Sequence, residues 1–161
     1  AGRSRGGGCE PMKATILIAD DDEAIRRALA DRLRYWGHAV TEAADGEAAA
    51  AEAARKTFDL VILDLAMPGL SGLEVLDRLR ESGSRAEKVV LSAYGSLQKV
   101  VDAMKRGADD FLTKPADFEI LRAVVDRALE KQRLRRVNEA FSLKDAVMTR
   151  TPLETAVRVL L

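Results

Sequence analysis

Residues 15–22 read TILIADDD, a short apolar and β-branched run followed by three consecutive aspartates. A run of this kind, cut off by polar residues, is typical of a buried β-strand. The pattern returns as LVILD at 60–64, VVLS at 89–92 and DFLTKP at 110–115. Each time, a carboxylate, a hydroxyl or an ammonium group follows the apolar residues. The chain therefore places reactive groups repeatedly at the end of a predicted strand.

The segments between these runs have helical periodicity, and residues 38–41 form a weaker fifth strand candidate. An alanine-rich helix is expected over 43–55 with Asp45 as its N-cap, and Gly37 should end the helix before it. Apolar residues three or four positions apart mark the other helices: Ile25, Leu29 and Leu33; Leu73, Leu76 and Leu79; Leu97, Val100, Val101 and Met104; Phe118, Leu121, Val125 and Ala128.

Strand and helix thus alternate five times, which predicts an α/β fold with a doubly wound, five-stranded parallel sheet. Helices would cover both faces, so nearly all strand residues should be apolar. In such sheets ligands bind at the carboxyl ends of the strands. The polar groups that end the four strong strands should therefore meet at one site.

Composition limits the remaining possibilities. The 161 residues suit one domain, and 26 basic residues balance 26 acidic ones, so no overall charge favours nucleic acid or membrane. One cysteine excludes an internal disulfide framework, and no apolar run is long enough to span a bilayer, so we expect a cytoplasmic protein without membrane contact. Residues 1–11, which have no apolar signal segment, should form a disordered extension.

The acidic residues of the predicted site favour a divalent cation. Two carboxylates about 4 Å apart repel by roughly 4 kcal/mol at an effective dielectric near 20. Asp20, Asp21 and Asp64 together therefore need a counter-cation, and Mg²⁺ accepts such oxygen ligands while keeping positions open for a phosphate. Asp22 fits better as a helix cap, since a helical segment starts just after it.

Asp64 is the candidate nucleophile, because a carboxylate at a strand end can attack phosphorus and form an aspartyl phosphate. The Met67-Pro68-Gly69 turn would shape the loop after it so that a backbone carbonyl faces the metal. Ser92 can donate to phosphoryl oxygens, and Lys114 can stabilise developing negative charge. The Lys114-Pro115 dipeptide suggests a constrained peptide with cis as a candidate form.

Four motifs carry a family resemblance: ILIADDDEAIRR, VILDLAMPGLSGLEVL, VVLSAYGS and GADDFLTKP. In this order they resemble the receiver domain of two-component response regulators, over residues 12–130. The resemblance implies a flavodoxin-like (βα)5 fold and a phosphoacceptor, not an enzyme, with slow autodephosphorylation. Asp64 would take its phosphoryl group from a sensor histidine kinase.

The resemblance also implies roles for single residues. Mg²⁺ would be bound by Asp21, Asp64 and the Ala66 backbone carbonyl, with Asp20 acting through water. Ser92 and Lys114 would contact the phosphate. Phe111, a core aromatic on periodicity alone, takes the place of the family's switch aromatic.

Residues 131–161 are expected to form a helical linker and the start of a truncated output domain, with a new short helix at Thr151-Pro152. They resemble the junction in NtrC-type transcription activators, where an AAA+ ATPase domain follows; a frayed tail after a single-domain regulator is the alternative. A homodimer would form through the fourth helix, fifth strand and fifth helix, or through the linker. DNA or transcription machinery would be reached only through the missing output domain.

Two other functions stay open at this point. A phosphatase of the haloacid dehalogenase type uses a similar set of groups, but it needs a second Asp two residues after the nucleophile, where this chain has Ala66. A receiver-like domain that only binds partners would use the same fold without being phosphorylated.

Overall fold

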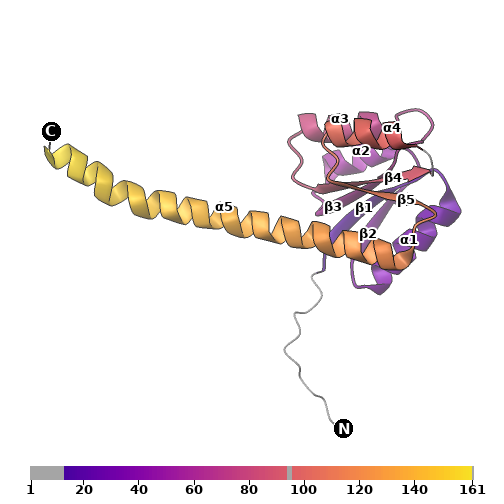
Figure 1. Cartoon of the computed structure of the whole chain (residues 1–161), viewed down its shortest axis with the longest axis horizontal. Coiled ribbons are helices and arrows are strands. Elements are labelled where there is room, and N and C mark those ends of the chain that lie inside the picture. The colour runs from indigo at the N-terminus through magenta and orange to yellow at the C-terminus, as the bar shows by residue number, and fades with distance from the viewer. Residues whose placement is uncertain (1–12, 94–95, 161) are drawn as a thin grey trace, which may run out of the picture. The chain divides into compact units, whose positions relative to one another are not determined.

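The computed structural model describes residues 13–93 and 96–160, with side chains up to residue 141. The expected extension at 1–11 lies outside the described residues. Strands and helices alternate along the described chain (Figure 1): β1 (Thr15–Ala19), α1 (Glu23–Tyr35), β2 (Ala39–Ala43), α2 (Gly46–Arg55), β3 (Leu60–Asp64), α3 (Gly72–Glu81), β4 (Glu87–Ala93), α4 (Leu97–Lys105), β5 (Asp110–Lys114) and α5 (Phe118–Leu160).

The strands form one parallel sheet in the order β2-β1-β3-β4-β5. The chain moves outward from β1 to β2 and then returns to place β3 on the other side of β1. Ala19 pairs with Leu63 in the register of β1 and β3. The residues that follow these two strands therefore emerge side by side, at the point where the strand order reverses and α/β proteins bind ligands.

Helices cover both faces of the sheet, as predicted. Helices α1 and α5 pack on one face, and α2, α3 and α4 pack on the other (Figure 1). Successive residues of β1 face the two cores alternately: Ile16 and Ile18 belong to the first, and Leu17 and Ala19 to the second. This double coverage explains why β1 and β3 are apolar apart from Thr15 and Asp64 at their ends.

The two edge strands differ from the sequence prediction. Strand β2 starts at Ala39 and not at His38, and it runs to Ala43, which we had placed in the alanine-rich helix. Only Leu112 of β5 is buried, so the expectation of a fully covered fifth strand is wrong. Because β5 is the last strand of the sheet, it lacks a neighbour on one side.

The predicted helix ends are largely confirmed. Asp45 caps α2 by accepting a hydrogen bond from the Ala48 N–H (2.7 Å). Gly37, with φ of 98°, ends α1 in the left-handed region that favours glycine. Among the described residues, no helix is both long and apolar enough to cross a membrane.

Helix α5 is continuous over 43 residues, so the separate helix expected at Thr151-Pro152 is wrong. The φ angle of proline fits a helix, although a proline inside one removes a backbone hydrogen bond and costs about 3 kcal/mol. Contacts divide the chain into a unit that ends at Leu129 and a second unit from Glu130.

Candidate phosphoryl and metal site

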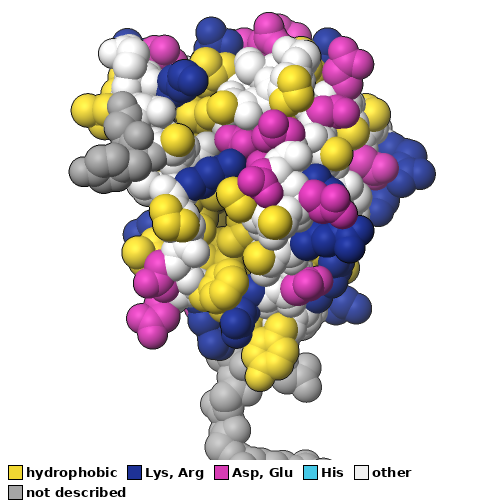
Figure 2. Space-filling view, turned by 90° about the vertical axis from the view of Figure 1, so that its right-hand side faces the viewer, with side chains coloured by type: hydrophobic (Ala, Val, Ile, Leu, Met, Phe, Trp, Pro, Cys, Tyr) yellow, Lys and Arg dark blue, Asp and Glu magenta, His cyan; other side chains and the backbone are white. Residues whose placement is uncertain are grey.

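Three carboxylates meet at the carboxyl ends of β1 and β3, as predicted. Asp20 is fully buried and Asp64 is 4% exposed, whereas Asp21 is exposed. Each can offer one oxygen such that the three oxygens lie within 4.8 Å of one another. Figure 2 looks onto this edge of the molecule, where acidic and basic side chains lie close together beside a band of apolar ones. This oxygen donor set fits a hard divalent cation.

Lys114 supplies positive charge to the same cluster. Its Nζ lies 2.8 Å from Asp20 Oδ2 and 2.8 Å from Asp64 Oδ2. The residue ends β5, so its long side chain reaches across the end of β4, and the Lys114-Pro115 peptide is cis. Desolvation by burial alone would lower the pKa of Lys114, but the hydrogen bonds to Asp20 and Asp64 outweigh it and raise that pKa.

The pKa of Asp64 is raised above that of an ordinary carboxyl. Desolvation by burial is the main cause, and the nearby charge of Asp20 adds to it. The hydrogen bonds from Lys114 Nζ (2.8 Å) and from the Ala66 N–H to Oδ1 (3.1 Å) act in the opposite direction. A second positive charge at this cluster would therefore favour the ionised, nucleophilic form of Asp64.

Local hydrogen bonds hold the β1–α1 loop in place. The Asp20 N–H donates to the Ala43 carbonyl (3.2 Å), and Asp20 Oδ1 accepts from the Asp22 N–H (2.9 Å). Asp22 itself caps α1 by accepting from the Ile25 N–H (3.2 Å). This bond confirms that Asp22 is a cap and leaves Asp20 and Asp21 for the cluster.

Ser92 is buried near the end of β4, and Phe111 lies on the exposed side of β5. Ser92, 4% exposed near the end of β4, donates its hydroxyl to the Ala93 carbonyl (3.2 Å). Phe111 is 45% exposed, so the interpretation as a core aromatic is wrong. Side chains alternate along a strand, and burial of Leu112 sends its neighbour to the other side of an edge strand.

The carboxylates open into a pocket of about 280 Å³, which is lined by Asp21, Asp22, Asp64, Leu65, Ala66, Leu91, Ser92, Ala93, Ser96, Lys99 and Lys114. Sequence analysis missed Ser96 and Lys99. Both lie at the start of α4, and Lys99 is exposed. In the sequence they look like residues of any solvated helix face. They reach the pocket only because the chain turns back after β4 in the folded structure.

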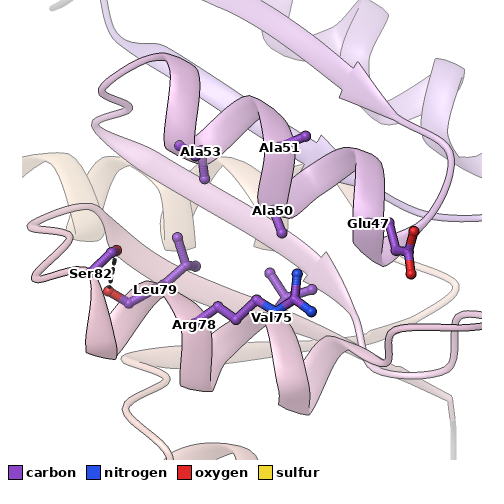
Figure 3. Close-up of a pocket in the computed structure, with 9 residues that line it drawn as sticks. Glu47, Ala50, Ala51, Ala53, Val75, Arg78, Leu79 and Ser82 are labelled. Atoms are coloured by element: carbon purple, nitrogen blue, oxygen red, sulfur yellow. Dashed lines mark hydrogen bonds between the residues drawn. The ribbon is translucent and has the colours of Figure 1, made fainter.

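A larger pocket of about 590 Å³ lies between α2 and α3 (Figure 3). Alanines of α2 and Val75 and Leu79 of α3 make it mainly apolar, with Glu47 and Arg78 as its charged residues. It contains no cluster of carboxylates or nucleophile–lysine pair. Of these two pockets, the smaller one therefore holds the carboxylates, hydroxyl and lysine that could act on a phosphate.

The chain matches the family model described as the response regulator receiver domain over residues 16–126. The transcriptional regulatory protein YkoG of Bacillus subtilis is 41% identical over 119 residues, which is 74% of this chain and 52% of that protein. The nitrogen assimilation regulatory protein NtrX of Azorhizobium caulinodans is 37% identical over 142 residues, 87% of this chain and 31% of that protein. The chain thus spans about half or less of these relatives.

Two solved structures are similar to this chain in fold and in sequence. The crystal structure of Brucella abortus NtrX in complex with ATP superimposes with a TM-score of 0.76 and 35% identity, covering 80% of this chain and 29% of that one. The isolated receiver domain of the same protein gives a TM-score of 0.68 and 36% identity, over 71% of this chain and 98% of that one.

Proposed function

This chain belongs to the family of response regulator receiver domains, and we propose that it is a phosphoacceptor switch in which Asp64 is phosphorylated. The arrangement of Asp64 beside two further carboxylates, with Lys114 bridging it to Asp20, carries the proposal. The donor would be the phosphohistidine of a sensor histidine kinase. An oxygen of Asp64 would form the new bond to phosphorus as the bond from phosphorus to the imidazole nitrogen breaks and its electron pair leaves with the imidazole.

Asp21, Asp64 and the Ala66 carbonyl would hold Mg²⁺, with Asp20 contributing through water. When bound, Mg²⁺ would offset the negative charge of the carboxylates and of the phosphoryl oxygens. The chain's own groups do the rest. Lys114 would turn from the carboxylates to a phosphoryl oxygen, and the Ser92 hydroxyl would leave the Ala93 carbonyl to donate to another.

These movements would alter the surface of α4, β5 and α5. Several large apolar side chains are already exposed there, among them Leu97, Val101, Met104 and Phe111. Phe111 would turn inward as Ser92 moves, which would change the shape of this surface. We propose that the altered surface, or the helical linker, controls pairing with a second copy.

The output is proposed to be regulation of transcription. ZraR of Salmonella typhimurium, 35% identical over 121 residues, is named a transcriptional regulatory protein, and this chain spans 27% of it. Residues 131–161 would then lead into an output domain of the NtrC type, through which DNA or the transcription machinery is reached. The family match and Ala66 in place of the acid two residues after Asp64 argue against a haloacid dehalogenase phosphatase. Hydrolysis would be limited to slow autodephosphorylation.

Phosphorylation of the full chain tests the proposal. With Mg²⁺ and acetyl phosphate, intact-mass measurement should show one added phosphoryl group that hydroxylamine removes, as expected for an acyl phosphate. Asp64→Asn should gain none, and EDTA should prevent the gain. Asp31→Asn is a matched control, since Asp31 is an exposed carboxylate of α1.

Two results would contradict it. An Asp64→Asn variant that gains the same mass would show that another residue is the acceptor. A wild-type chain that binds Mg²⁺ and gains no phosphoryl group from either acetyl phosphate or a phosphorylated kinase would instead be a receiver-like binding module.

A further inference from the structure

Arg26 joins the acidic loop to the edge strand β2. The residue lies in α1, and its guanidinium donates from Nη1 to the Asp20 carbonyl oxygen (2.9 Å) and from Nε to Glu42 Oε1 (3.2 Å). Its side chain is only 12% exposed. The same guanidinium therefore connects the backbone of a candidate metal ligand to a carboxylate of the neighbouring strand.

The Asp20 carbonyl, which accepts from Arg26, belongs to the peptide between Asp20 and Asp21, two of the three carboxylates of the cation site. Asp20 and Asp21 are consecutive, so the peptide that joins them sets the direction of both side chains. The Asp20 N–H is held by the Ala43 carbonyl, and Oδ1 of Asp20 is held by the Asp22 N–H. Arg26 satisfies the carbonyl, which is the remaining polar group of the Asp20 backbone.

Glu42 in turn fixes the guanidinium. One of its oxygens accepts from Arg26, and the other accepts from Arg34 Nη1 (3.2 Å) of the same helix. Glu42 also directly precedes Ala43, whose carbonyl receives the Asp20 N–H. The last two residues of β2 thus hold the acidic loop at two points.

From these contacts we propose that Arg26 is a positioning residue for the cation site, oriented by Glu42. It keeps the Asp20–Asp21 peptide in the orientation that directs both carboxylates toward Asp64. The inference rests on the proposed function, because it concerns the cation which that function requires. Groups that hold metal ligands in place commonly determine metal affinity without touching the metal.

The direction in which the Mg²⁺ affinity changes when Arg26 is replaced distinguishes a positioning role from electrostatic repulsion. Arg26 is itself a cation near the cluster, so loss of its charge alone should strengthen Mg²⁺ binding. Loss of positioning should weaken it, because the carboxylates would no longer be held toward one another. A role in packing alone should lower stability and leave the affinity for Mg²⁺ unchanged.

Calorimetric titration of the full chain with Mg²⁺, without any phosphodonor, distinguishes these cases. We expect Arg26→Gln to weaken binding about tenfold. Arg27→Gln is the matched control: it removes the same charge from the next residue, which pairs with Glu23 in solvent (3.2 Å). Its affinity should equal or slightly exceed that of the wild type, because the lost charge is exposed and screened. Arg26→Lys should lie between, since an ammonium cannot donate to both partners in the same geometry.

Urea unfolding of each variant accompanies the titration. An Arg26→Gln chain that is less stable but binds Mg²⁺ as well as, or more tightly than, Arg27→Gln overturns the inference. If Arg26→Gln does not fold, Arg26→Lys decides: weaker binding than wild type supports positioning, and equal binding refutes it. A wild type that binds Mg²⁺ without becoming phosphorylated overturns the proposed function alone, whereas one that binds no Mg²⁺ overturns both.

Discussion

Burial disfavours the charged forms of both Asp64 and Lys114, but it decides the direction of the pKa shift only for Asp64. Burial raises the pKa of Asp64 and so disfavours its charge, despite the bond from Lys114. The pKa of Lys114 is raised because its two carboxylate partners outweigh its desolvation. The site therefore holds a destabilised anion and a stabilised cation, which suits a carboxylate that must react and a lysine that must stay charged.

Asp64→Asn should make the metal-free chain more stable at neutral pH, by about 1 kcal/mol. The folded-state pKa of Asp64 is raised, so the native state binds its proton more tightly than the unfolded state does. Wild-type stability should then fall as the pH rises through the interval between the ordinary carboxyl pKa, about 4, and the folded value. Urea unfolding from pH 4 to 8 with EDTA measures the difference, which should shrink as the pH is lowered. A difference that grows on acidification would contradict the assignment.

Lys114→Met should lower the free energy of unfolding by about 3 kcal/mol without Mg²⁺, since it leaves two buried carboxylates without their cation. Mg²⁺ should recover part of this loss. Because the folded-state pKa of Lys114 is raised, its stabilising effect is fully present at neutral pH and disappears only as the pH rises through that value, above the ordinary lysine pKa of about 10.4. The deficit should thus be constant from pH 7 to 9.

Lys99→Met is the control for this prediction. Lys99 lines the same pocket, but within the described part of the chain it forms no ion pair. Its substitution should change stability by less than about 0.5 kcal/mol. Equal losses for the two variants would show that the ion pairs of Lys114 contribute nothing specific.

At the scale of elements, the start of α3 lies directly against the backbone of the nucleophile. A Cβ added at Gly72 would lie 2.3 Å from the Asp64 carbonyl oxygen and 2.9 Å from Leu65 Cα. Ser71, just before it, caps the helix and forms a capping box with Glu74. Position 72 therefore needs glycine, because the first turn of α3 packs against the backbone at the end of β3 and leaves no room for a side chain.

Gly72→Ala should destabilise the chain by about 2–3 kcal/mol, because neither contacting backbone group can move without displacing Asp64. It should also slow phosphorylation by acetyl phosphate. Gly83→Ala is the comparison, since Gly83 has φ of 72° but an added Cβ there meets nothing within 4 Å. Backbone strain alone should cost about 1 kcal/mol there. Phosphorylation rates that fall equally in both variants would rule out the local effect on Asp64.

At the scale of the whole molecule, the part of the second unit whose side chains are described, residues 130–141, exposes large apolar side chains. Leu134, Val137 and Phe141 follow one another at spacings of three and four residues, so they share one side of α5. A matching stripe on a second copy is the simplest cover for such a face. This supports the proposed pairing through the linker.

Val137→Asn should weaken self-association of the full chain about a hundredfold, because each of the two copies loses the burial of one side chain, which contributes roughly 1.5 kcal/mol. Sedimentation velocity over a range of concentrations measures the change. Arg136→Asn, on another side of the helix, should leave association unchanged. A wild-type chain that stays monomeric at every concentration, phosphorylated or not, would refute pairing.

The amino-acid sequence alone was enough to predict the fold and the main residues of the candidate site. Strands β1, β3 and β4 are mainly apolar because helices cover both faces, and polar residues stand where the chain leaves the sheet. The periodicities of strands and helices, with caps such as Asp22 and Asp45, were therefore readable locally. Where cover is incomplete, as at β2 and β5, the local signal weakened, so Ala43 was wrongly assigned to a helix and the core interpretation of Phe111 was wrong.

Only the tertiary structure decided which groups hold the site in place. Arg26 and Glu42 are sixteen residues apart and look like ordinary surface charges in the sequence, yet the fold pairs them with each other and places Arg26 on the Asp20 carbonyl. Lys99 reaches the pocket only because α4 returns beside the strand ends. The side chain of a residue determines its chemistry. Its contacts depend on strand order and register, which no local sequence pattern reveals.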